Sequence, residues 1–186
     1  LTINTGADLT VYGDWDNGGL PNIGLGKIIF AGTSQVVKGT NNFNNITINN
    51  GSTVTLMSSG QALAGILLCN GVLNTNDYLT LLSNASGTAL ISGSSIGLVN
   101  GSVVQQRFIP AAKAKGYKHF SSAFSNAHIG QFSNFMTLYL GNTNSNPYPT
   151  IFKFSEADAN PLFANGWIEA APQGATNTII PPGIGY

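Results

Sequence analysis

The chain of 186 residues has an unusual charge content. Only 8% of its residues are charged against 42% hydrophobic, and Lys+Arg 7 balance Asp+Glu 7. This composition argues against a nucleic-acid partner, which needs a clustered excess of Lys and Arg, and against docking on an anionic membrane. No apolar run reaches the roughly 18 residues of a membrane-spanning helix. Asn, Thr, Ser and Gly replace the charges, and because these residues favour turns over helices, we expect an all-β protein.

Residues 1–109 consist of short alternating runs separated by Gly, Asn and Ser, a pattern typical of strands. One phrase, apolar-x-apolar-x-Asn-Gly, begins at Ile46, Ile66 and Ile96. A second phrase, an apolar residue on each side of a threonine, is centred on Thr10, Thr55 and Thr80. Repetition at intervals of about 20 residues or more is typical of a solenoid, in which each coil buries its apolar edge on its neighbours.

Two architectures fit these repeats. Asn-Gly also favours a tight hairpin, so the runs could pair antiparallel within a sandwich. The recurrence of the phrase favours the solenoid, and so does the scarcity of charge at the turns, because Asn can stack on Asn in successive coils whereas carboxylates repel one another. We therefore predict a parallel β-helix-like solenoid over residues 1–109. Its core should receive the side chains of Ile46, Ile48, Ile66, Leu68, Ile96 and Leu98.

The composition changes near residue 109. Residues 110–186 hold 12 of the 18 aromatic residues and 7 of the 8 prolines, which indicates a domain boundary. Alternating runs predict strands over residues 117–120, 136–140 and 151–154, and Ser155 could cap a helical turn that ends at residue 158. We expect residues 110–186 to form the start of an antiparallel β-sandwich, unfinished at its C-terminal end.

Both ends of the chain interrupt a pattern. Leu1 lies inside an alternating run, and Tyr186 is not followed by a closing element. We therefore expect a fragment of a longer polypeptide, whose other modules are its first partners. The single Cys69 lies in the apolar run 66–69, and we expect it to be a buried thiol.

Several stretches together resemble the large adhesin-like surface proteins of gliding Bacteroidota. Residues 9–18, 28–32 and 42–48 look like the coils of those proteins, and residues 104–110 with 119–124 are similar to a junction found in them. Residues 165–167 and 182–186 look like a later turn and strand of the same group. The resemblance implies export by the type nine secretion system, with its translocon as a partner during export, and display at the extracellular cell surface in connection with gliding motility.

A β-helix also raises the question of polysaccharide lyases and hydrolases, which need converging carboxylates. Asp14 and Asp16 flank Trp15 and would lie about 7 Å apart on one face of a strand, at ~3.3 Å per residue. Such a pair could hold calcium or act on a glycosidic bond. Because it adjoins Asn17-Gly18, where aspartate is ordinary in a turn, we expect turn chemistry instead.

The sequence therefore predicts a non-catalytic structural or adhesive segment of a secreted bacterial surface protein, without catalytic residues, metal or cofactor. The alternative is a glycan-binding module with extracellular polysaccharide as its partner, and a divergent β-helix lyase or hydrolase is less favoured. Exposed aromatic side chains can stack on sugars, although in a β-sandwich they usually belong to the core. Weak candidate ligand contacts are Asp14, Trp15, Asp16 and Trp167.

Overall fold

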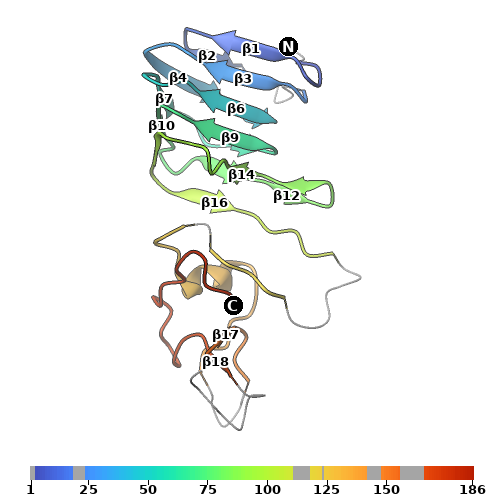
Figure 1. Ribbon diagram of the computed structural model, residues 1–186, viewed down its shortest axis with the longest axis vertical. Helices are drawn as coiled ribbons and strands as arrows, with labels where there is room; N and C mark the ends of the chain where they lie inside the picture. Colours follow the sequence, from blue (N-terminus) through green and yellow to red (C-terminus); the bar gives the residue numbers. More distant parts are fainter. Residues whose placement is uncertain (1–2, 19–23, 111–117, 123, 142–147, 156–165) are drawn as a thin grey trace. The chain divides into compact units, whose positions relative to one another are not determined.

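The computed structural model describes residues 3–18, 24–110, 118–122, 124–141, 148–155 and 166–186. The chain divides into two compact units, residues 1–114 and 115–186. Unit 1 is a parallel β-solenoid of about four turns (Figure 1). The described residues of unit 2 form a short antiparallel strand pair and one 3-10 helix. In its described part the protein is all-β apart from that short helix, as the composition predicts.

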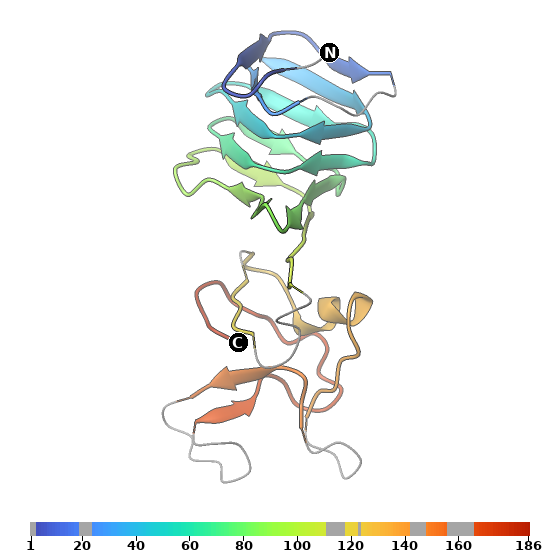
Figure 2. The same cartoon turned by 90° about the vertical axis from the view of Figure 1, so that its right-hand side faces the viewer.

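Three parallel sheets make up the solenoid, and each coil supplies strands to them in turn (Figure 2). Sheet I contains β1 (Asp8–Val11), β3 (Lys27–Phe30), β6 (Asn45–Ile48), β9 (Ile66–Cys69) and β14 (Leu90–Ile91). Sheet II contains β2 (Trp15–Asn17), β4 (Ser34–Gly39), β7 (Thr53–Leu56), β10 (Val72–Asn74) and β15 (Leu98–Asn100). Sheet III contains β5 (Asn41–Phe43), β8 (Gln61–Leu63), β11 (Leu79–Leu81) and β16 (Val103–Gln105).

The pairing within these sheets confirms the predicted solenoid. Every pair of neighbouring strands in sheets I, II and III runs parallel. The Asn-Gly pairs at positions 50–51 and 70–71 lie at corners between sheet I and sheet II, so they turn the chain into the next sheet and do not close hairpins. Among the described residues of the unit, the one hairpin joins β12 (Ser83–Asn84) to β13 (Gly87–Thr88) in the last coil.

Inward-facing side chains form columns through successive coils. In sheet I, Ile28 pairs with Ile46, and Ile46 pairs with Leu67. In the next column Phe30 pairs with Ile48, which is fully buried. Alternate residues of each strand therefore fill the core, as period-two geometry requires.

The predicted core positions are correct in one coil and wrong in the next two. Ile46 and Ile48 are buried, but Ile66 is 48% exposed and Leu68 faces outward, whereas their neighbours Leu67 and Cys69 are buried. The repeated phrase is therefore one residue out of step with the structure, and a slip of one residue moves every side chain to the other face.

The third copy of the phrase lies in a different sheet. Leu98 belongs to β15 of sheet II and is 55% exposed, and Ile96 lies in the corner before it and is 78% exposed. Neither side chain enters the core, so the prediction for both is wrong.

Glycine allows adjacent coils to approach closely at the corner between sheets I and II. A Cβ atom on Gly71 would lie 2.2 Å from the carbonyl oxygen of Ser52, and one on Gly97 would lie 2.0 Å from the carbonyl oxygen of Gly71. Both distances are far below van der Waals contact, so no larger residue fits at either corner unless the backbone moves.

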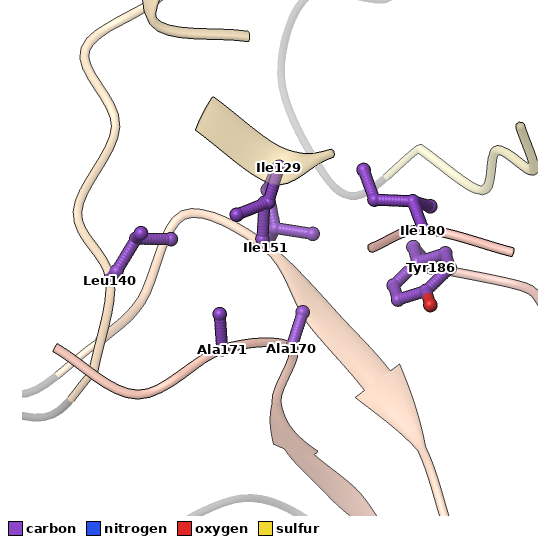
Figure 3. Packing of buried hydrophobic residues seen from close by; sticks show 7 residues of the cluster. All are labelled: Ile129, Leu140, Ile151, Ala170, Ala171, Ile180 and Tyr186. Atoms are coloured by element: carbon purple, nitrogen blue, oxygen red, sulfur yellow. The ribbon is translucent and has the colours of Figure 1, made fainter. Parts of the chain in front are cut away.

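Unit 2 has its own small core (Figure 3). Strand β17 (Phe152–Phe154) pairs antiparallel with β18 (Trp167–Glu169), and the 3-10 helix η2 (Ile129–Asn134) packs Ile129 into the cluster. The buried members of this cluster are Ile129, Leu140, Ile151, Ala170, Ala171, Ile180 and Tyr186. Burial raises the pKa of the Tyr186 phenol above its ordinary value.

The strand predictions for unit 2 are only partly confirmed. The run 151–154 contains β17, but residues 118–120 and 136–140 are not strands, although the amide of Thr150 donates to the carbonyl of Tyr139 at 2.9 Å. Residue 117 and the greater part of the expected helical turn at 155–158 lie outside the described residues.

The register in sheet I can be tested with two neighbouring residues of β9. We expect Leu67→Ala to lower the free energy of unfolding by about 2–5 kcal/mol, because it leaves a cavity in the core. Ile66→Ala should cost about 1 kcal/mol or less, because that side chain is 48% exposed. Urea unfolding followed by circular dichroism measures both values, and a larger effect for Ile66 would contradict the register.

Candidate functional site

Trp15 is part of the packing of the solenoid. It lies in β2, its ring centroid is 6.3 Å from that of Phe43, and its indole N–H donates to the side-chain oxygen of Asn41 at 2.8 Å. The side chain is half-buried, with its polar atom already in use. The ring is therefore held against the next coil.

The two aspartates beside Trp15 have different surroundings. The carboxylate of Asp14 accepts the backbone N–H of Val36 at 2.9 Å, which ties the first coil to the second. Asp16 is exposed and stands opposite Lys38 in the register of sheet II. Within the described residues, no group of three His, Cys, Asp or Glu side chains is placed to hold a metal ion.

Trp167 belongs to unit 2 and forms an aromatic cluster on β18. Its ring lies 5.4 Å from that of Phe154 in an edge-on arrangement and 5.7 Å from that of His119. Phe154 is 53% exposed, His119 is exposed and Trp167 is half-buried. The candidates Trp15 and Trp167 thus lie in different units, each packed against aromatic neighbours.

The side chains of His128 and Cys69 also contact the backbone of the fold. The ring nitrogen Nδ1 of His128 lies 3.2 Å from the carbonyl oxygen of Thr176. Cys69 is fully buried, as predicted, with Sγ 3.5 Å from the carbonyl oxygens of Gly71 and Leu98. Burial raises the pKa of this thiol, so the reactive thiolate is disfavoured.

A chain of neutral polar side chains crosses the interior of the solenoid. The amide of Asn41 accepts from Trp15 and donates to the side-chain oxygen of Gln61 at 2.8 Å. Gln61 in turn donates to the backbone carbonyls of Gly39 and Ser58. Asn41 and Gln61 are at most 1% exposed, and the hydrogen bonds from Trp15 through Asn41 to Gln61 join three successive coils.

Gln35 and Thr75 act in the same way at other corners. Gln35 accepts from the amide of Gly32 at 2.8 Å and donates to the carbonyl of Val11, and Thr75 donates to the carbonyl of Ser102 at 2.9 Å. These residues were missed in the sequence, although a signal exists: Gln35, Asn41 and Gln61 each stand two positions before a core residue, where alternation calls for an apolar side chain. Those core residues are Val37, Phe43 and Leu63.

Comparison with models of protein families, with curated proteins and with solved structures finds no match to this chain. Of the helices in the described part of the chain, none is long and apolar enough to cross a membrane.

The role of Asp14 can be separated from metal binding. We expect Asp14→Ala to lower the free energy of unfolding by about 1 kcal/mol, because the Val36 amide loses its side-chain acceptor, and Asp16→Ala to change it by less than about 0.5 kcal/mol. Millimolar calcium should leave the melting temperature of the unaltered protein unchanged to within about 1 °C. A calcium-dependent rise that both substitutions abolish would identify a cation site instead.

Proposed function

We propose that this chain is a non-catalytic structural or adhesive segment of a secreted bacterial surface protein. One observation carries the proposal: the polar side chains in the interior of the solenoid are engaged in hydrogen bonds between coils. Asn41 and Gln61 each bond to groups on neighbouring coils or corners, and Trp15 completes the series. Groups bound in this way stabilise the fold and are not free to act on a substrate.

The outer surface of the solenoid supports the same proposal. The amide of Asn100 donates to the side-chain oxygen of Asn74 at 3.1 Å, and the amide of Asn74 donates to the hydroxyl of Thr55 at 3.2 Å. This ladder follows sheet II through three coils. Neutral amides can repeat in this way without the repulsion that stacked carboxylates suffer, so the coil is suited to a long stalk of low charge.

The setting of the proposal comes from the resemblance to adhesin-like surface proteins of gliding Bacteroidota. Export by the type nine secretion system and display at the cell surface are part of the proposal, with other modules of the same polypeptide as partners. The low charge and the abundance of Asn, Thr and Ser are compatible with an extracellular surface. A module that binds extracellular polysaccharide is the alternative function.

We propose further that unit 2 belongs to an antiparallel β-sandwich. Its support is the antiparallel pair β17 and β18, together with a core that draws residues from positions 129 to 186. The reciprocal backbone bonds between Phe120 and Tyr186, at 3.0 Å and 2.9 Å, add a further long-range contact of the kind that joins strands in a sandwich.

The structural role of the interior amides can be tested at Gln61. We expect Gln61→Leu to lower the free energy of unfolding by about 2–4 kcal/mol, because it removes the buried bond from the Asn41 amide and the bonds that Gln61 donates to two corner carbonyls. The same substitution at the exposed Gln105 serves as the control and should cost less than about 0.5 kcal/mol. If thermal unfolding showed equal losses of stability for Gln61→Leu and Gln105→Leu, the interior hydrogen bonds would not be a special source of stability.

The absence of catalysis is tested by incubation with pectin, alginate, chitin and cellulose. We expect no release of reducing ends or unsaturated products above a heat-denatured control, because the Asp14 carboxylate is engaged with the backbone of the next coil. Robust cleavage that disappears in Asp14→Ala or Asp16→Ala would overturn the proposal and favour a divergent lyase or hydrolase.

A further inference from the structure

The corners between sheet I and sheet II differ in length from coil to coil. The corner between β6 and β7 comprises residues 49–52, the next one, between β9 and β10, only residues 70–71, and the one between β14 and β15 residues 92–97. A short corner is therefore flanked on both sides by longer ones. The result is an open groove across the edge of the solenoid, with a volume of about 420 Å³. We call it the corner groove.

The two walls of the corner groove differ in chemistry. One wall is formed by residues 50–53, which include Asn50, and the floor at 70–72 includes Asn70 and Gly71. The opposite wall consists of residues 96–98, where Ile96 is 78% exposed and Leu98 is 55% exposed. None of the residues that line the groove carries a charge.

The asparagines of the solenoid differ in whether their side-chain amides are engaged in hydrogen bonds. Asn41, Asn74 and Asn100 use their side-chain amides to join one coil to the next. The described residues offer no such partner to the side chains of Asn50 and Asn70. Each of these two amides therefore keeps two donors and an acceptor available to a ligand.

A ligand that suits this groove must be uncharged, rich in groups that both donate and accept hydrogen bonds, and apolar on one side. A sugar ring has these properties, because its hydroxyl groups lie at the edge and its C–H bonds form an apolar face. We propose that the corner groove binds a neutral polysaccharide. The Asn50 and Asn70 amides would bond to hydroxyl groups, and the Ile96 and Leu98 side chains would cover the apolar face of a ring.

This inference goes beyond the structural role of the solenoid, because a stalk does not need a binding groove to fulfil that role. It also assigns binding to residues other than the aromatic side chains of Trp15 and Trp167. A groove of about 420 Å³ lies within the usual range of small-ligand sites, roughly 300–1,000 Å³, and it is open to solvent.

The test is native affinity electrophoresis of the whole chain in gels that contain laminarin, galactomannan or xyloglucan, with alginate as the anionic comparison. We expect at least one neutral polysaccharide to retard the protein and alginate to have no effect. Retardation should not change between about 0.05 M and 0.5 M salt, because no charge takes part in the contact.

Substitutions then locate the site. The double variant Asn50→Ala/Asn70→Ala should weaken binding about tenfold or more through two lost hydrogen bonds, and Ile96→Ser should weaken it several-fold. Asn42→Ala on the exposed face of sheet III and Leu90→Ser, at a side chain that is 46% exposed, are the matched controls and should bind within twofold of the unaltered protein. Because Ile96 is so exposed, its variant keeps the site testable even if the double variant does not fold.

Several outcomes would overturn the assignment. They are no retardation by any of the three neutral polysaccharides, retardation by alginate alone, and retardation that the groove variants leave unchanged or that the controls weaken equally. Loss of binding in Trp167→Ala but not in the groove variants would assign recognition to the aromatic cluster of unit 2 instead.

Discussion

The solenoid depends on the hydrogen bonds that join each coil to the next. Along the three sheets the backbone supplies these bonds itself, but at the corners the ladders are interrupted and carbonyl groups turn inward. Gln35 and Gln61 bond to these carbonyls through their side-chain amides, and Asn41 links Gln61 to Trp15. Neighbouring strands lie about 4.8 Å apart, so equivalent side chains of successive coils are close together. Two like charges at such positions would repel each other, whereas a neutral amide can both donate and accept hydrogen bonds. This requirement keeps charged side chains out of the interior, and none is buried among the described residues.

The recurrence of a short phrase was sufficient to predict parallel coils, but it did not determine the register. Asn-Gly marks a corner, and the distance from a corner to the next inward residue varies because the corners themselves vary in length. In the run 66–69 all four residues are apolar, so alternation does not indicate which pair faces inward. A strand with one polar face would have set the register, whereas this strand fits the core in either frame. The structure places Leu67 and Cys69 inside.

The candidate residues illustrate a related limit of sequence reasoning. Charged and aromatic side chains drew attention because they can bind ligands, yet Asp14 and Trp15 make contacts between coils. The neutral amides of Gln35, Asn41 and Gln61 were not among the candidates, although the sequence places each of them two residues before an apolar residue. In unit 2, the alternating run 136–140 has the composition of a strand but is not one. Strand formation requires a partner that is distant in sequence, and local alternation carries no information about it.

The corners vary in length from coil to coil, and for this reason the repeated phrase did not predict the register. The same variation also shapes the surface of the solenoid. Inward residues are constrained by packing and by the hydrogen bonds of neighbouring coils, so they leave little freedom for recognition. Corners are constrained only where coils touch, as at Gly71 and Gly97, and elsewhere can lengthen at small cost in stability. A short corner between two longer ones yields a groove without any change in the core. Recognition and stability are then carried by separate residues of one coil, Asn70 at the corner and Leu67 in the core. Such a fold can therefore acquire or lose a binding site while its stacked coils remain intact.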